Sequence, residues 1–239
     1  MAGELPARAG DGQQVEIWLP FTGLWQARNS PARRVPSHGT DLFGGRYAID
    51  FIGVDGHHRT AGTRDWRTLV GSEPPERFVA FGRPVLAPGD GTVVHVHDAE
   101  PDHEARRSQL ALVPYALGQA GRVRRGAGAV AGNHLVVHLH ESGTAVLLAH
   151  LQQGSVLVSP GQEVAAGQHI ARCGNSGNST QPHVHLQVMD DADPFVARGV
   201  PMTFRHSSEW PARTRQPQVR GRGMPGEGAV VEPLPAAAP

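Results

Sequence analysis

The sequence predicts a mostly β protein, a compact folded antiparallel β-sheet with loop insertions. Glycine occupies 30 of the 239 positions and aromatic residues only 5%, a composition typical of a turn-rich β fold. Short runs of alternating apolar and polar residues recur between glycine- and proline-containing turns, with the period of two that half-buried strands have. The length suits one sizeable domain with insertions, or at most two small ones.

Charge and composition narrow the possible partners. The formal net charge is zero and the pI is about 7.3, so nothing favours a nucleic acid or an anionic membrane as a partner. No apolar run is long enough to span a bilayer, and the amino terminus lacks the apolar core of a secretory signal. We therefore expect a cytoplasmic protein unless another route exports it to the cell wall. The single cysteine, Cys173, is expected to be a small buried residue rather than a nucleophile.

The first quarter of the chain contains a carboxylate in an unusual place. Residues 1–36 are expected to form a strand (15–21, at a sheet edge because of Pro20) and a loop that pack on the main domain. The next strand, 46–52, is apolar after Arg46 except for Asp50. A carboxylate there is costly unless a positive group compensates it, as a metal ion with a nearby histidine would.

Two polar insertions, near 53–80 and 98–131, separate the strands of the middle of the chain. Residues 85–97 predict a strand, a Gly-Asp-Gly turn and a second strand, and residues 158–170 repeat this glycine-punctuated pattern. Both stretches resemble the turns of biotinyl and lipoyl carrier domains, which carry their cofactor on a lysine. All 22 basic residues here are arginine, so this chain cannot be such a carrier.

The second half of the chain begins with a predicted β-hairpin and ends in a stretch with no strand or helix pattern. Residues 133–140 and 145–151 predict paired strands around a Glu-Ser-Gly-Thr turn. Beyond Pro194 the chain is irregular, and its arginine, glycine and proline content predicts a disordered tail at 211–239. The main domain is expected to span 37–210.

Histidines alternate with apolar residues in three predicted strands. On a strand, two residues at i and i+2 point the same way and lie about 6.6 Å apart, so each pair could chelate a metal or simply form a polar face. Spacing does not decide between these two interpretations, even for the last pair, which follows a glycine- and serine-rich loop and Pro182. The three pairs are His95 and His97, His138 and His140, and His183 and His185.

The stretch 174–188, Gly-Asn-Ser-Gly-Asn-Ser-Thr-Gln-Pro-His-Val-His-Leu-Gln-Val, resembles the closing motif of the lysostaphin-like zinc metallopeptidases. These are peptidoglycan endopeptidases with a barrel-sandwich, or duplicated hybrid motif, fold. Their motif reads roughly G-N-[ST]-G-x-[ST]-T-G-P-H-[LV]-H-[LFW]-E. This chain departs from it at Gln181, where glycine is usual, and at Gln187, where glutamate is common. The segment 149–151, Ala-His-Leu, matches a second region of the family.

The resemblance implies a role for five residues. It assigns one Zn²⁺ per chain to a set of three ligands, namely His38, Asp50 and His185, and catalysis to two further histidines, His150 and His183. In an alternative register, Asp41 would replace Asp50, but Ser37 would then stand where the family has a histidine. The register with Asp50 resembles a longer-spaced variant of the motif and supplies both ligands, so we prefer it.

The resemblance further implies a zinc metalloendopeptidase whose substrate is the peptide stem or cross-bridge of peptidoglycan. Two imidazoles and one carboxylate leave the fourth position of a tetrahedral zinc open, as in catalytic sites. Three alternatives are a zinc peptidase acting on another peptide, a non-catalytic binding or regulatory module of the same fold, and a phosphocarrier that uses His150 and His183 as a relay pair. For the last of these, His38 and Asp50 would be dispensable.

Overall fold

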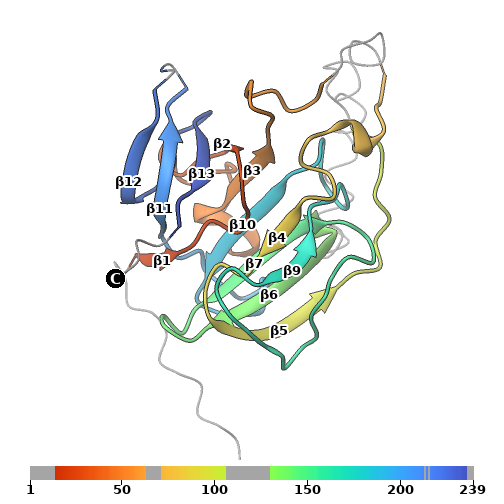
Figure 1. The fold of residues 1–239 in the computed structure, drawn as a ribbon. Coiled ribbons are helices and arrows are strands. Elements are labelled where there is room, and N and C mark those ends of the chain that lie inside the picture. The colour runs from red at the N-terminus through yellow and green to blue at the C-terminus, as the bar shows by residue number, and fades with distance from the viewer. Residues whose placement is uncertain (1–13, 63–70, 106–129, 213, 215, 236–239) are drawn as a thin grey trace, which may run out of the picture.

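The structure, a computed structural model, is dominated by strands, which confirms the predicted fold class (Figure 1). No helix within the part that it describes is long and apolar enough to cross a membrane. The described residues are 14–62, 71–105, 130–212, 214 and 216–235.

Within these residues, the strands form one 11-stranded sheet and a separate two-stranded sheet. The strands of the large sheet are β1 (Val15–Ile17), β2 (Trp25–Arg28), β3 (Ile49–Gly53), β5 (Gly91–His97), β6 (Asn133–Leu139), β7 (Ala145–Leu151), β8 (Glu163–Val164), β10 (Val184–Met189), β11 (Met202–Trp210), β12 (Gln218–Gly223) and β13 (Val230–Pro233). The small sheet pairs β4 (Pro84–Leu86) with β9 (His169–Arg172). Two 3-10 helices are η1 (Leu42–Tyr47) and η2 (Pro75–Arg77).

The order across the large sheet is β1-β11-β13-β2-β3-β10-β7-β6-β5-β8, with β12 paired to β11. All of its pairs are antiparallel except β1 with β11, so the sheet is mixed. Strand β1 is at an end of this order, as Pro20 predicts, although the strand already stops at Ile17. The predicted hairpin of β6 and β7 is confirmed.

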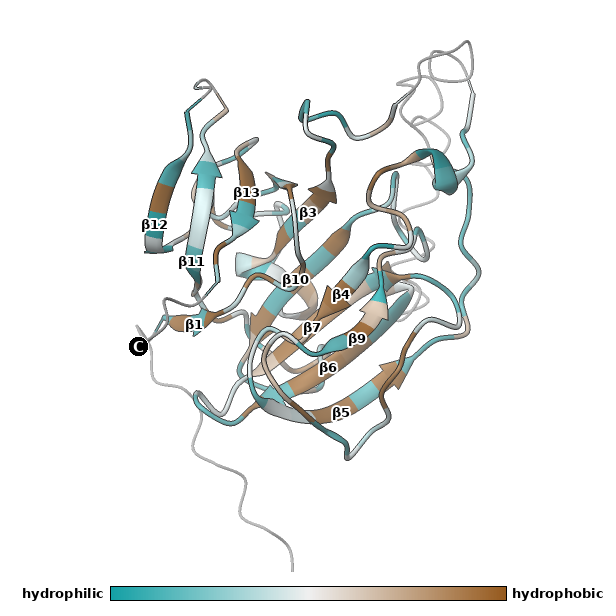
Figure 2. Ribbon diagram, in the orientation of Figure 1, coloured by the Kyte–Doolittle hydropathy of each residue, from teal (hydrophilic) through white to brown (hydrophobic). Residues whose placement is uncertain are grey.

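A single large core lies against one face of the sheet. On β10, Val184, Leu186 and Val188 are fully buried in it, and the residues between them face the other way, so hydrophobic and hydrophilic residues alternate along this strand (Figure 2). The described part of residues 1–36 also packs on this core, because the Phe21 ring meets the Phe51 ring of β3 edge-on with centroids 4.9 Å apart. The predicted domain boundaries stay a prediction.

The polar insertions are only partly described. Residues 98–105 close onto the loop before β10, where Asp102 accepts hydrogen bonds from the backbone N–H groups of Gln153 and Asn175. A basic cluster of the insertion, Arg122 with Arg124 and Arg125, lies outside the described residues. The described end of this insertion therefore fixes the loop that leads into the His183 motif.

The prediction of an irregular end followed by a disordered tail is wrong for the described residues. Residues 202–210 form β11, and β12 and β13 lie within the expected tail (Figure 1). The composition of 211–239 concealed a short apolar run, Ala229 to Val231, whose residues are all buried. Strand β13 lies between β11 and β2, and it is stabilised because its backbone N–H and C=O groups form hydrogen bonds with strands on both sides.

The first two His-x-His pairs lie apart from the third. His95 and His97 of β5 lie beside His134 of β6, and their ring centroids are 5.1 and 5.6 Å from that of His134. His140 lies on the surface beside Glu163, 3.2 Å between Nε2 and Oε2. Burial, with smaller effects from His95 and His97, lowers the pKa of His134 to about 4, so this histidine is neutral at pH 7.

Strand β13 provides a test of the ordered tail. The change Val231→Ala removes methyl groups from a fully buried position, and we expect it to lower the free energy of unfolding by about 1–2.5 kcal/mol. The matched change Val219→Ala on β12, where valine is 76% exposed, should cost less than about 0.5 kcal/mol. Urea unfolding measures both values, and equal small effects would mean that the tail does not pack.

His134 gives a test at acidic pH. Because its folded-state pKa of about 4 is below the ordinary 6.5, the unfolded chain binds the proton first as the pH falls. Its contribution to stability is therefore complete above about pH 6.5 and is lost between there and pH 4, on the order of 3 kcal/mol. Urea unfolding from pH 7 to pH 4.5 should show a steeper loss for the wild type than for His134→Gln. Parallel curves would contradict this assignment.

Candidate metal centre

The centre of the sheet brings three of the predicted site residues together. Asp50 of β3 lies directly opposite His185 of β10, and His38 reaches the same point from the loop before η1. One ligand atom from each of these residues lies within 4.8 Å of the other two. Asp41 is not part of this group, because its exposed carboxylate pairs with Arg46.

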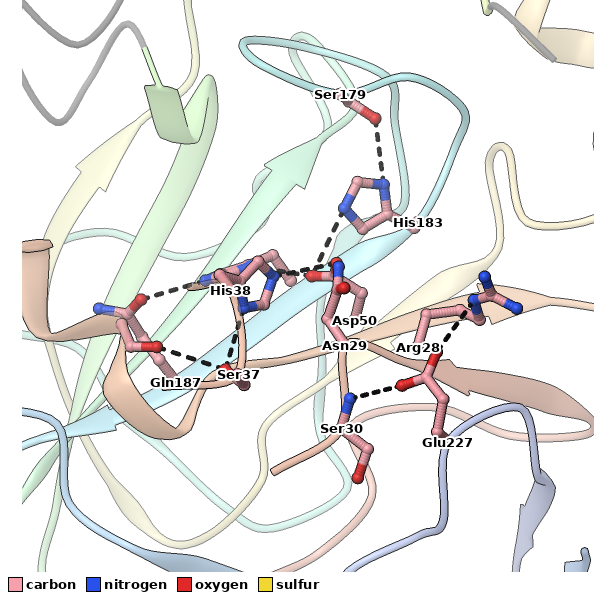
Figure 3. Close-up of polar contacts among 12 residues, drawn as sticks. Arg28, Asn29, Ser30, Ser37, His38, Asp50, Ser179, His183, Gln187 and Glu227 are labelled. Carbon is pink, nitrogen blue, oxygen red and sulfur yellow. Dashed lines mark hydrogen bonds and ion pairs between the residues drawn. The ribbon is translucent and has the colours of Figure 1, made fainter. Parts of the chain in front are cut away.

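The Asp50 carboxylate is the common partner in this cluster (Figure 3). Its Oδ1 lies 2.9 Å from His185 Nδ1, and its Oδ2 lies 3.1 Å from His38 Nε2. Oδ2 also accepts a hydrogen bond of 2.7 Å from the Asn29 side chain. Burial opposes the charged form, but the adjacent His38 and His183 and the histidine hydrogen bonds hold the pKa of Asp50 well below its usual value. The carboxylate is therefore a buried anion surrounded by imidazoles.

Each ligand histidine has a second partner at its other ring nitrogen. His38 Nδ1 lies 3.0 Å from Ser37 Oγ, and His185 Nε2 lies 3.1 Å from Gln187 Oε1. Although burial opposes charge on His185, its hydrogen bond and attraction to Asp50 raise its pKa. These outer contacts fix the ring orientations, so that His38 presents Nε2 and His185 presents Nδ1 to the same point.

A β-bulge places His150 beside this cluster. Across the β6–β7 pair, Asn133 faces Leu151 and His134 faces Ala149, so His150 is the extra residue and adopts a φ of 61°. As a result, two consecutive residues, Ala149 and His150, line the same pocket, which regular alternation would forbid. His150 Nδ1 donates a hydrogen bond of 2.9 Å to the Ser176 carbonyl.

The rings of His150 and His183 face each other, with centroids 4.6 Å apart. His183 Nδ1 donates to the Gln181 carbonyl over 2.8 Å, and its Nε2 lies 3.6 Å from Asp50 Oδ1. Burial, helped by nearby imidazoles, lowers the pKa of both His150 and His183, so both are neutral at pH 7. In both rings, Nε2 remains as the nitrogen that can take up a proton.

All five predicted residues line one cavity of about 330 Å³. Its walls are otherwise mainly apolar, with Leu42 and Phe43 from η1, Leu147 and Ala149 from β7, and Pro194. The cavity therefore joins a possible metal site to a surface that fits small apolar groups.

Three residues of the site carried no clear signal in the sequence. Asn29 and Ser37 stand in a polar loop where any asparagine or serine reads as a turn residue. Gln187 stood out only as a departure from the family motif. Asn133 of β6 is polar and fully buried but is not part of this site. Its side chain donates to the Glu100 and Leu151 carbonyls and accepts a hydrogen bond from the Glu100 N–H, so its contacts support the backbone of the strands.

Comparison with known proteins identifies a similar family over part of the chain. The model of peptidase family M23 matches residues 115–196, which include His150, His183 and His185 but neither His38 nor Asp50. The peptidoglycan DD-endopeptidase ShyA of Vibrio cholerae is 28% identical over 117 residues, which make up 49% of this chain and 20% of ShyA. The chain thus matches only about a fifth of the length of this relative.

Solved structures of similar proteins include two peptidases. The catalytic domain of lysostaphin from Staphylococcus simulans aligns with a TM-score of 0.37 and 19% identity over 66% of this chain and 78% of that one. The deep-sea M23 metalloprotease pseudoalterin aligns with a TM-score of 0.41 and 15% identity over 79% of this chain and 76% of its own. The match to the family model and the curated relative confirm the expected resemblance to the lysostaphin-like peptidases of family M23, with residues 115–196 as the stretch that matches the family.

Proposed function

We propose that this protein is a zinc metalloendopeptidase that hydrolyses peptide bonds in peptidoglycan stems or cross-bridges. The observation that carries the proposal is the convergence of ligand atoms from His38, Asp50 and His185 within 4.8 Å of one another. Two further imidazoles, of His150 and His183, line the same cavity as these ligands. A ligand set beside two proton-transfer groups is what metal-assisted hydrolysis requires.

The donor set fits zinc. Two imidazole nitrogens and one carboxylate oxygen match the three protein ligands of many catalytic zinc sites. His185 supplies a further argument, because both of its nitrogens face acceptors, Asp50 Oδ1 and Gln187 Oε1. A neutral imidazole can donate to only one of these two acceptors, so either a second proton or a metal cation must lie between the other nitrogen and its acceptor. Zinc at this point would therefore be held by His38 Nε2, His185 Nδ1 and an oxygen of Asp50.

When bound, zinc would supply Lewis-acid chemistry, polarising a scissile carbonyl and lowering the pKa of a water molecule. The chain's own contribution is the positioning of two neutral imidazoles. His150 and His183 each donate Nδ1–H to a backbone carbonyl, which leaves each Nε2 free to accept a proton and return it to the departing amine. Burial keeps both unprotonated at pH 7, the state that a general base needs.

Peptidoglycan as the substrate is supported by the curated relative, whose name states a peptidoglycan DD-endopeptidase activity. The matched part of this chain includes the predicted catalytic pair, His150 and His183. The mainly apolar cavity walls also suit a peptide with small side chains better than a highly charged ligand.

Mass spectrometry of fragments released from purified peptidoglycan tests the proposal. The zinc-loaded protein should release cross-link peptides, and a chelated sample should not. Replacement of Asp50 by alanine should abolish zinc binding and release together. The variant His183→Ala should keep its zinc but lose about 10²- to 10⁴-fold in rate, as expected when a proton-transfer group is removed.

His140→Ala is the matched control, because this histidine lies on the surface beside Glu163 and its removal should change neither zinc content nor rate. Cleavage of other peptides but not of peptidoglycan would reject the substrate and keep the peptidase. A zinc-loaded protein that binds peptidoglycan without cutting any peptide would instead identify a binding module. Phosphorylation of His150 or His183 that survives in Asp50→Ala would identify a phosphocarrier.

A further inference from the structure

A buried amide lies behind the proposed metal ligand His185. Gln187 follows two residues later on β10, on the same face of the strand, and is only 5% exposed. Its Oε1 lies 3.1 Å from His185 Nε2. A buried polar side chain needs partners for all its groups, and the partners of this amide are specific.

The other end of the amide is a donor with its own acceptors. Gln187 Nε2 donates to the Phe43 carbonyl of η1 over 2.6 Å and contacts Met189 Sδ at 2.9 Å. Because the Phe43 carbonyl can only accept, the amide nitrogen must face η1 and the amide oxygen must face His185. The oxygen in turn can only accept, so His185 must carry its proton on Nε2.

The backbone of η1 adopts an unusual conformation at this contact. Phe43 has a φ of 58° and Gly44 a φ of 72°, both in the left-handed region that side chains disfavour. A Cβ at Gly44 would also lie 2.9 Å from Met189 Cγ. The contact between the Phe43 carbonyl and Gln187 therefore depends on a strained backbone conformation at Phe43 and on a glycine at position 44.

We propose that Gln187 is a positioning residue that selects the Nδ1-coordinating tautomer of His185, and that the Phe43 carbonyl fixes Gln187 in the required orientation. This inference rests on the proposed metal site. The relay runs from the Phe43 carbonyl through the Gln187 amide to His185 Nε2, and it leaves the lone pair of Nδ1 directed toward Asp50 and the metal position. Only the contact with Phe43 needs an amide, because a carboxylate could accept from His185 but could not donate to the Phe43 carbonyl.

Zinc affinity, measured by competition with a chromophoric chelator, tests the relay without any substrate. Gln187→Leu removes both contacts and should weaken zinc binding about 10- to 100-fold, the usual effect of losing an outer partner of a metal ligand. Gln187→Glu retains the acceptor for His185, so zinc binding should stay within a few-fold of the wild type. The metal-free Gln187→Glu protein should nevertheless melt at a lower temperature, because two acceptors then face each other at Phe43.

Gly44→Ala provides a second, independent variant. It keeps the Gln187 residue, but its Cβ would lie 2.9 Å from Met189 Cγ and 3.3 Å from Gln187 Nε2, so it should disturb the contact between Gln187 and the Phe43 carbonyl and weaken zinc binding. The matched control is Gln26→Leu, which removes an amide that donates to the Gly228 carbonyl in the turn before β13 and should leave zinc affinity unchanged.

The tautomer itself can be read from long-range ¹H–¹⁵N spectra of the zinc-loaded wild type. We expect His185 to show a protonated Nε2 and a metal-shifted Nδ1. Coordination through Nε2, or unchanged zinc affinity in Gln187→Leu, would overturn the relay while leaving the metal site intact. A wild-type protein that binds no zinc would overturn the relay together with the proposed function.

Discussion

The structure depends on keeping one carboxylate, Asp50, charged in the interior of a β-sheet. A buried anion costs several kcal/mol unless positive groups or hydrogen-bond donors surround it. Here Asn29, His38 and the neighbouring His183 and His185 approach it from three different segments of the chain. The sheet pairing of β10 with β3 and β7 holds His185 beside Asp50, and the two loops that carry Asn29 and His38 each add a partner to the carboxylate. The same requirement makes the site suitable for a cation, which would replace the protons that the imidazoles otherwise share with the carboxylate.

The register of the sheet determines which side chains surround Asp50. His185 lies between Asp50 on β3 and Ala149 on β7, so a small side chain occupies the position next to the proposed metal. The bulge in β7 then turns His150 onto the same face. A left-handed φ at a histidine is uncommon and costs about 1–3 kcal/mol, which the surrounding hydrogen bonds to Ser176 and Gly174 offset. The strained backbone at His150 thus brings its imidazole beside that of His183 in the cavity.

Sequence reasoning could find the parts of the site that follow a periodic pattern. Alternation on β10 places His183, His185 and Gln187 on one face, and the resemblance to a family motif selected Asp50 over Asp41. The outer partners Asn29 and Ser37 could not be predicted, because their roles depend on which distant loop folds against the carboxylate. The strands of the tail were missed for a related reason. An apolar run as short as that of β13 is stable only because β11 and β2 are already present on both sides.

The most direct test of the central claim is anomalous diffraction at the zinc absorption edge from crystals grown with one equivalent of zinc. The account predicts a single strong peak within coordination distance of His38 Nε2, His185 Nδ1 and an Asp50 oxygen. A peak at the second histidine cluster of His95, His97 and His134, or no peak near Asp50 at saturating zinc, would contradict it.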